Sequence, residues 1–229
     1  MLAPLAVSLL ADPRAAAGAA GAEVVARYGF DAVSGVVTGS ADDSGHGNAL
    51  HAIGGGQVAA VAHDAGRALR FPAGCCARVV LEAAPSPALN PGRAAFSFGA
   101  SVRLTAEETS PGANVVQKGY SDSPGGQWKL QVDGSAGRPS CRVVGAGART
   151  GYLAMAGRSV ADGRWHQLTC RRTANQLSLN VDGAVQAVRA IPADLTVANN
   201  VPLRIGGKGA GRANDQFHGE VDDVYLSLG

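Results

Sequence analysis

Oxygen-bearing side chains gather in two stretches of the sequence, one towards each end. The segment from Asp42 to Asn48 mixes carboxylates and an amide with glycines, and Asp222 and Asp223 lie close to the C-terminus. Calcium binds about six to eight oxygen atoms of carboxylates, amides and backbone carbonyls. Five residues are therefore candidate calcium ligands: Asp42, Asp43, Asn48, Asp222 and Asp223. In the alternative interpretation, Asp42 or Asp43 closes an Asx turn, which Asp222 orders through backbone N–H groups.

Other metal-binding and nucleophilic patterns are absent from the sequence. The histidines, at positions 46, 51, 63, 166 and 218, include no pair with the spacing of a zinc ligand set. There is no Gly-x-Ser-x-Gly elbow, and the glycines around Lys208 lack the spacing of a phosphate-binding loop. His166 follows Trp165, so we expect it to be a strand residue with one hydrogen-bonded ring nitrogen.

Aromatic side chains are the candidates for contact with a ligand, because a flat ring can lie against a sugar. Trp128 and Trp165 both lie in alternating segments, so we expect both in the core. Recognition residues tend to lie on loops that a rigid scaffold holds. The predicted ligand-contacting residues are therefore the loop candidates Tyr120, Asp122 and Tyr152.

The four cysteines, an even number, suit an oxidising compartment. Cys141 and Cys170 each lie in a strand-like segment. If those strands neighbour each other, a disulfide between them closes a loop of about 30 residues and contributes about 3 kcal/mol. Cys75 and Cys76 are adjacent in the sequence. Three states remain possible for this pair: a strained vicinal disulfide, two free thiols, or a metal site. We favour a structural role for this pair, because no CxxC spacing or basic cluster lowers a thiol pKa.

Composition indicates the scaffold that holds these residues. The chain has 229 residues, of which 46% are hydrophobic and 17% charged, and it contains 32 glycines. A single all-β domain fits this length and glycine content. The net charge of +2 comes from interspersed acids and bases. No basic stripe is present for nucleic acid or for a charged membrane surface, so neither is an expected partner.

The first residues resemble a secretory leader. An apolar run from Leu2 to Ala11 precedes an alanine-rich stretch, although Arg14 follows the run instead of preceding it. We expect residues 1–22 to be a signal peptide or a disordered leader, residues 23–229 to be the domain, and the protein to be secreted. The run is too short to span a membrane, which takes about 20 apolar residues.

Short apolar segments recur after this leader, with turn signals such as Asp133-Gly134, Asp162-Gly163 and Asp182-Gly183 between them. The pattern predicts a two-sheet antiparallel sandwich. Beyond an alternating start at residues 23–30, the expected strands are 49–53, 67–71, 79–82, 95–104, 114–118, 127–132, 140–144, 165–171, 176–182, 184–188, 203–206 and 217–227. We expect loops at residues 38–48 and at 104–113, the latter as a hairpin loop or one helical turn.

An ordered series of short motifs resembles the laminin G-like, concanavalin A-like lectin/glucanase domains, in their bacterial secreted form. The motifs are Phe30-Asp31, residues 42–48, 66–71 and 86–91, Val116-Gln117-Lys118-Gly119, residues 162–166, Val181-Asp182-Gly183, residues 204–207, and residues 218–225. The resemblance covers residues 23–229 and implies an all-β jelly-roll sandwich of two antiparallel sheets. It also implies that the C-terminal strand lies near the start of the domain, where Asp222 or Asp223 would join the calcium loop.

For function, the resemblance implies binding, since such domains attach to carbohydrates or to proteins, many of them with calcium. We expect a secreted, noncatalytic module that binds an extracellular glycan or another ligand, with calcium as a stabilising ion. Two alternatives remain: a glycoside hydrolase of the same superfold, and an adhesive domain that binds protein. Some hydrolases of this superfold carry a second glutamate shortly after a pair like Glu220 and Asp222. Here the positions where that glutamate should stand are occupied by Val224 and Tyr225. We therefore expect no catalytic residues.

Overall fold

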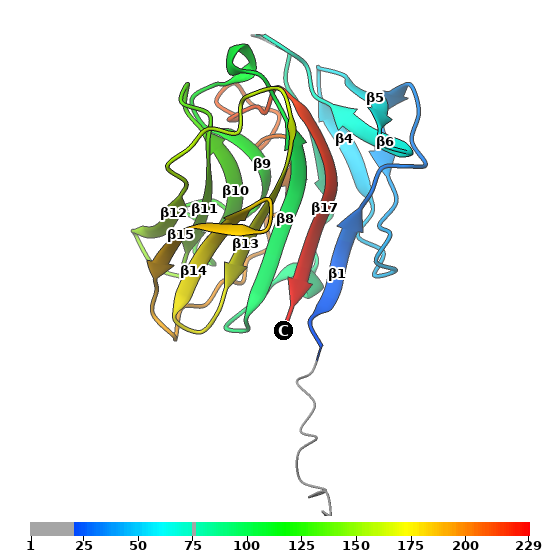
Figure 1. Ribbon diagram of the computed structural model, residues 1–229. Coiled ribbons are helices and arrows are strands. Elements are labelled where there is room, and N and C mark those ends of the chain that lie inside the picture. Colours follow the sequence, from blue (N-terminus) through cyan, green and yellow to red (C-terminus); the bar gives the residue numbers. More distant parts are fainter. Residues whose placement is uncertain (1–20, 75–76) are drawn as a thin grey trace, which may run out of the picture.

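The computed structural model describes residues 21–74 and 77–229, which form two packed antiparallel sheets (Figure 1). This is the predicted all-β jelly-roll sandwich. Nearly all of the expected leader, residues 1–20, and the pair Cys75 and Cys76 lie outside the described residues. Within the described part of the chain, no helix is long and apolar enough to cross a membrane.

The first sheet has nine strands. Its order is β15-β14-β13-β8-β17-β6-β5-β2, and β1 also pairs with β17. Its strands are β1 (Glu23–Tyr28), β2 (Val36–Val37), β5 (Val58–His63), β6 (Gly66–Arg70), β8 (Phe96–Arg103), β13 (Trp165–Arg172), β14 (Gln176–Val181), β15 (Ala184–Ala190) and β17 (Glu220–Leu228). The first and last strands of the domain lie side by side (Figure 1), as the resemblance implies.

The second sheet has eight strands in the order β12-β11-β10-β9-β16-β7-β4-β3. They are β3 (Gly39–Ser40), β4 (Leu50–Gly54), β7 (Val79–Ala83), β9 (Ala113–Lys118), β10 (Gln127–Asp133), β11 (Arg138–Val144), β12 (Gly151–Met155) and β16 (Leu203–Ile205). Two short 3-10 helices, η1 (Pro87–Leu89) and η2 (Ala106–Glu108), lie in connections. The second of these is the helical turn expected within residues 104–113.

The structure contains two longer strands that the sequence did not predict, β5 and β12. In β5 three alanines interrupt the contrast between apolar and polar positions, so the alternation is weak. β12 has five residues and begins with a glycine, so its sequence resembles that of a loop. The expected loop at residues 38–48 also contains the two-residue strand β3.

The core between the sheets holds the disulfide and a cluster of aromatic rings. Cys141 on β11 and Cys170 on β13 are joined, with their Cα atoms 5.6 Å apart, and both are fully buried. The disulfide prediction is confirmed, but the two strands belong to different sheets, so the bond crosses the sandwich instead of joining neighbours within one sheet. The ring of Trp128 lies 4.7 Å from that of Phe98, centroid to centroid.

The two tryptophans occupy different environments. Trp128 is fully buried in the core, as predicted. Trp165 is not in the core: its ring stacks on His63 at a centroid distance of 3.8 Å and stays partly exposed. The physical reason is that successive side chains of a strand point to opposite faces. Leu168 and Cys170 point into the core, so Trp165, an odd number of positions away from both, points outward.

Candidate functional site

A row of polar side chains crosses the outer face of the second sheet. Along β10, Trp128, Leu130 and Val132 are buried in the core, so Lys129 between them points to the outer face. The strand register then fixes its neighbours. Arg204 on β16 pairs with Gln117 on β9, Gln117 pairs with Lys129, and Lys129 pairs with Arg142 on β11.

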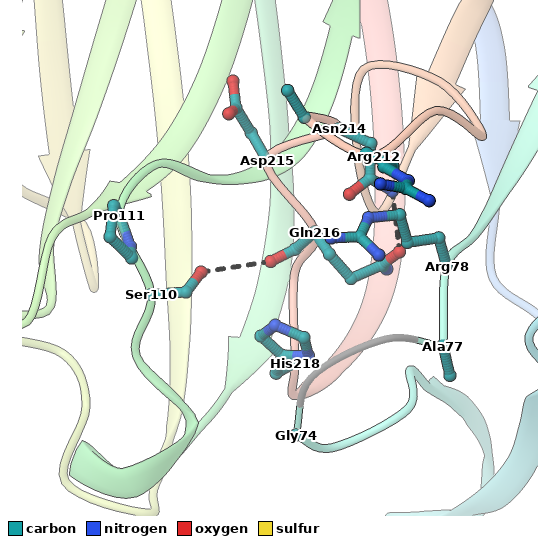
Figure 2. Close-up of a pocket in the computed structure, with 11 residues that line it drawn as sticks. Gly74, Ala77, Arg78, Ser110, Pro111, Arg212, Asn214, Asp215, Gln216 and His218 are labelled. Atoms are coloured by element: carbon teal, nitrogen blue, oxygen red, sulfur yellow. Dashed lines mark hydrogen bonds between the residues drawn. The ribbon is translucent and has the colours of Figure 1, made fainter.

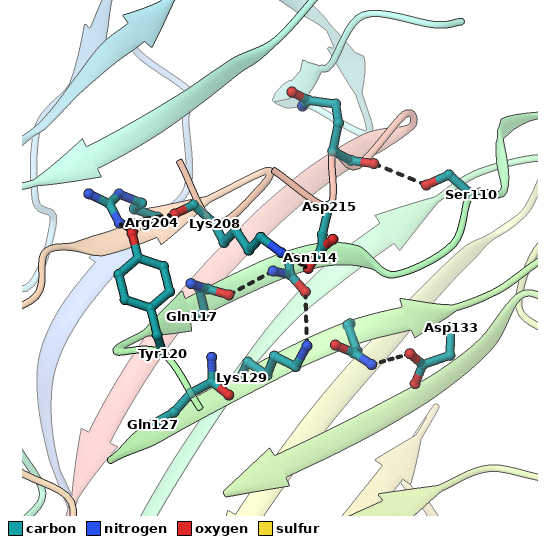
Figure 3. Close-up of polar contacts among 12 residues, drawn as sticks. Ser110, Asn114, Gln117, Tyr120, Gln127, Lys129, Asp133, Arg204, Lys208 and Asp215 are labelled. Carbon is teal, nitrogen blue, oxygen red and sulfur yellow. Dashed lines mark hydrogen bonds and ion pairs between the residues drawn. The ribbon is translucent and has the colours of Figure 1, made fainter. Parts of the chain in front are cut away.

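Two connections border this row and make it a groove, and Figure 3 shows Tyr120 from one of them and Lys208 and Asp215 from the other. The β9–β10 connection supplies Tyr120, Ser121 and Asp122, and the β16–β17 connection supplies Lys208 and Asp215. The groove has a volume of about 440 Å³, and its floor is formed by Gln117, Gln127, Lys129 and Arg142. We call it the β10 groove.

Tyr120 is held in place from both of its ends. Its backbone N–H donates to Oγ of Ser123 at 2.9 Å, and its hydroxyl donates to the carbonyl of Lys208 at 3.0 Å. The guanidinium of Arg204 also donates to the hydroxyl, with its carbon 5.7 Å from the ring centroid. Arg204 is itself fixed by Glu82, at 2.6 Å from Nε to Oε2. The ring therefore forms a rigid wall of the groove.

Amide side chains tie the floor to the wall that carries Tyr120. Asn114 donates through Nδ2 to Oε1 of Gln117 at 2.6 Å. Gln117 and Gln127 both donate through Nε2 to the carbonyl of Gly119, at 3.2 and 3.1 Å. These bonds connect β9, β10 and the start of their connection, so the floor keeps one shape without a ligand.

The charged groups of the groove are unevenly paired. Lys208 contacts Asp215 at 3.0 Å between Nζ and Oδ2. Lys129 is partly buried and, among the described residues, its ammonium group hydrogen-bonds only the amide oxygen of Asn114, at 3.4 Å. Burial lowers the pKa of Lys129, although the charge of Asp215 opposes that effect.

The predicted ligand-contacting residues do not all meet here. Tyr120 and Asp122 line the β10 groove together. Tyr152 is not on a loop but in β12, opposite Val143, and its ring packs against the core. The position of Tyr152 shares the inward face with buried Ala154, two residues later. The interpretation of Tyr152 as a loop residue is therefore wrong.

Sequence reasoning missed most of the groove. Gln117, Lys129, Arg142, Lys208 and Asp215 belong to no motif of a catalytic or metal site. One signal was available: a lysine in the middle of the alternating strand at residues 127–132 must face away from the core.

The predicted calcium loop is closed by its own hydrogen bonds. Asp42 accepts the N–H of Arg27 at 3.1 Å, the N–H of Asn48 at 2.9 Å, and both the N–H and the hydroxyl of Ser44, at 2.9 and 2.6 Å. Burial raises the pKa of Asp42, but these donors outweigh burial, so the pKa lies below its usual value. This is the Asx turn of the alternative to calcium, but Asp222 does not order it, because Asp222 contacts His63 and the N–H of Asp223.

Three of the other four candidate ligands, Asp43, Asn48 and Asp222, also have side chains engaged elsewhere. Asp43 accepts the N–H of Gly29 at 2.8 Å, and Asn48 donates through Nδ2 to the carbonyl of Val25 at 2.9 Å. Asp222 contacts Nδ1 of His63 at 2.5 Å and accepts the N–H of Asp223 at 2.7 Å. Among residues 21–74 and 77–229, no group of three or more His, Cys, Asp or Glu side chains could hold a metal ion. The five residues therefore do not fit a common calcium site.

Glu220 and Asp222, the pair considered for hydrolysis, point outward from β17 on the first sheet, away from the β10 groove. Glu220 is 3% exposed, and its Oε1 lies 3.0 Å from Arg70 and 2.7 Å from Arg103. Burial raises the pKa of Asp222, and the hydrogen bond from His63 opposes that rise. Both carboxylates thus serve as partners of neighbouring basic groups.

A second, smaller pocket of about 240 Å³ is lined by the second half of the β16–β17 connection, residues 212–218 (Figure 2). Arg78, Arg212 and His218 are among its lining residues. The side-chain amide of Gln216 is fully used inside the protein, since it bonds both backbone groups of Val79 and the carbonyl of Gly206. Gly74 and Ala77 also line it, on either side of residues that the structure does not describe. We assign it no function.

Comparison with known families agrees with the fold. The family model described as concanavalin A-like lectin/glucanases superfamily matches residues 81–227, a segment that includes every residue of the β10 groove. No curated protein sequence matches the chain.

Several solved structures share the fold. Domain 4 of AbnA, a GH43 extracellular arabinanase from Geobacillus stearothermophilus, in complex with arabinotriose, matches with a TM-score of 0.70 and 15% identity, covering 91% of this chain and 93% of that one. The binding domain of Paraclostridial Mosquitocidal Protein 1 matches with a TM-score of 0.67 and 14% identity, covering 89% and 48%. The receptor binding domain of botulinum neurotoxin D matches with 0.63 and 10%, covering 89% and 48%. The chain spans about half the length of the two toxin domains, and these likenesses show the fold alone.

Proposed function

The chain belongs to the concanavalin A-like lectin/glucanase superfamily, and from this premise we propose that it is a noncatalytic module that binds a glycan in the β10 groove. The observation that carries the proposal is the groove itself: a preformed polar floor beside the fixed ring of Tyr120. Sugar binding needs hydrogen-bonding groups for hydroxyls and an apolar ring for the sugar face, and the groove offers both. The arabinotriose complex of AbnA domain 4 supports a sugar ligand for this fold.

The test is a glycan-array screen of the purified protein, followed by titration of one binding glycan against variants. Tyr120→Ala removes the wall and is expected to weaken binding about tenfold or more. Tyr225→Phe is the matched control, since Tyr225 lies on β17 in the other sheet. A protein that binds no glycan on the array would contradict the proposal and favour the adhesive alternative with a protein ligand.

The screen is run with calcium and with a chelator. Calcium was predicted from the sequence, but the five predicted ligands do not converge. Binding that a chelator abolishes would therefore indicate a calcium site built from other groups. Binding that survives the chelator would remove calcium from the proposal.

Secretion is a separate part of the proposal. It is supported by the apolar run and the alanine-rich stretch at the start of the sequence, and by the buried disulfide, which suits an oxidising compartment. Expression of the whole chain in a host with a secretion pathway, followed by N-terminal sequencing, tests it. A protein that stays inside the cells with Met1 retained would contradict it.

A further inference from the structure

We propose that the β10 groove selects glycans that carry an acidic substituent, a carboxylate or a sulfate, which binds between Lys129 and Arg142. This inference rests on the proposed function and goes one step further, since it names the class of glycan. The inference comes from two positively charged side chains on the floor, Lys129, which Figure 3 shows, and Arg142.

The strand register brings these two charges together. Lys129 on β10 is directly opposite Arg142 on β11, and both side chains point to the outer face. Like charges in opposing positions of a sheet destabilise it. The neighbouring strand β12 leaves room for the side chain of Arg142, because Gly151 has no Cβ atom. A Cβ atom there would lie 3.0 Å from both Cζ and Nε of Arg142. The guanidinium therefore lies against the backbone of β12, on the side of β11 away from β10.

The two charges lack an acidic partner in the part of the chain that the structure describes, because neither Lys129 nor Arg142 forms an ion pair there. Other basic groups around the groove are paired: Lys208 with Asp215, and Arg204 with Glu82. The floor thus holds two cations without an ion pair on opposing strands, with their Cβ atoms about 5 Å apart. Their charged ends lean away from each other, Lys129 towards Asn114 on β9 and Arg142 towards Gly151 on β12. An anionic group bound over β10 and β11 would draw both flexible side chains inward and accept a charge-assisted hydrogen bond from each.

The remaining charges of the groove fix where an acidic group can bind. Its lining has three cations, Lys129, Arg142 and Lys208, and two carboxylates, Asp122 and Asp215. Asp215 already faces Lys208, and Asp122 stands at the exposed rim. A ligand acid is therefore repelled by Asp122 at the rim, gains little from the Lys208–Asp215 pair, and is favoured at the floor. The neutral amides of Gln117 and Gln127 lie beside the floor cations, but both are buried and donate to the carbonyl of Gly119, so they shape the floor instead of contacting hydroxyls.

The test compares three oligosaccharides of equal length by titration calorimetry: an oligogalacturonate for carboxylate, a sulfated galacto-oligosaccharide without uronic acids for sulfate, and a neutral galacto-oligosaccharide. We expect at least one acidic probe to bind about tenfold more tightly than the neutral one, and to lose affinity between about 0.05 and 0.5 M salt. The two acidic probes distinguish carboxylate from sulfate.

Variants locate the effect. Lys129→Gln and Arg142→Gln are each expected to weaken the acidic probe about tenfold and to leave the neutral probe within about twofold. Arg189→Gln removes an exposed charge on β15 in the other sheet and is the control. Melting temperature is recorded for each variant, so that a folding defect is recognised.

The outcomes separate the inference from the proposed function. Neutral and acidic probes that bind equally would overturn the inference while the proposed function stands. Acidic binding that all three variants weaken equally would show a general charge effect and also overturn it. A protein that binds none of the probes and no glycan on the array would overturn both.

Discussion

Nδ1 of His166 lies 2.8 Å from Oδ2 of Asp182, and the ring's other nitrogen lies 3.1 Å from Oδ1 of Asp162. Asp182 also accepts the backbone N–H of Gln167 at 2.9 Å. The imidazole therefore joins the turn before β13 to the turn between β14 and β15, and uses both nitrogens, where the sequence predicted one.

The first prediction concerns the pH dependence of this contact. Burial lowers the pKa of His166, but the hydrogen bonds to Asp182 and Asp162 outweigh it, so the pKa is raised. A histidine with a raised folded pKa contributes stability that is full below its unfolded value of about 6.5 and is lost as pH rises through the folded pKa. His166→Gln is therefore expected to lower the melting temperature more at about pH 5.5 than at about pH 9. Equal losses at both pH values would contradict the prediction.

The second prediction concerns the disulfide across the sandwich. Cys141 and Cys170 are separated by 29 positions, and such a loop corresponds to about 3.5 kcal/mol of stability in the chain-entropy model. The double variant Cys141→Ala/Cys170→Ala is expected to lose about that free energy of unfolding in a urea titration. In a background with Cys75 and Cys76 changed to serine, reductant is expected to produce a similar loss. A loss below about 1 kcal/mol would show that the bond constrains little.

The third prediction compares two neighbouring arginines of β13. Arg172 is fully buried and donates to the carbonyls of Arg93, Ala94 at 2.7 Å and Leu195 at 2.9 Å. Arg172→Met would leave these buried carbonyls unpaired, and we expect it to cost about 3 kcal/mol of unfolding free energy. Arg171→Met is the matched control, because Arg171 points to solvent, and is expected to stay within about 0.5 kcal/mol. Similar losses for the two variants would contradict this assignment.

The sheets could be predicted from the sequence, because they follow from local alternation and turn residues. In β13, the inward positions of Leu168 and Cys170 also decide that Trp165 faces outward, so its exposure follows from the same pattern that was used to place it in the core. Tyr152 was misplaced for the opposite reason: a short strand that follows a glycine-rich segment gave too few positions to reveal its alternation.

The β10 groove depends on information that local sequence does not carry. The pairing of Lys129 with Arg142 is set by the β10–β11 register, and one residue of slip would place Arg142 on the other face. Lys208 and Asp215 reach the groove from a connection about 80 positions away from Lys129, through tertiary contacts such as the bond from Tyr120 to the carbonyl of Lys208.

The fourth prediction concerns the turn closed by Asp42. Asp42→Asn removes the acceptor of the Asn48 N–H while keeping an oxygen for the other donors, so we expect a loss of about 1 kcal/mol, and a larger loss for Asp42→Ala. Because the folded pKa of Asp42 is lowered, its contribution is present above the unfolded value of about 3.9 and is lost as pH falls through the folded pKa. The difference between wild type and Asp42→Asn should therefore shrink below about pH 3.5 in urea titrations. A difference that is constant from pH 7 to pH 3 would contradict the role of the charge.

The fifth prediction concerns Glu220, the residue on which a hydrolase interpretation would depend. Its carboxylate lies between two arginines on the first sheet, 3.0 Å from Arg70 and 2.7 Å from Arg103, and it is nearly inaccessible to a substrate. Glu220→Gln is therefore expected to act on folding, with a loss of about 1 to 2 kcal/mol moderated by the partial exposure of both arginines. Glu107→Gln, at an exposed position of η2, is the control and is expected to change little.

The same two variants separate a structural carboxylate from a catalytic one. Wild-type protein and Glu220→Gln are incubated with the glycan that binds most tightly, and released reducing ends are measured over time. Because a glycosidase needs an acid and a second carboxylate that both face the scissile bond, we expect no release by either protein. Release by the wild type that Glu220→Gln abolishes while binding persists would establish hydrolysis, and the binding module would then be an enzyme.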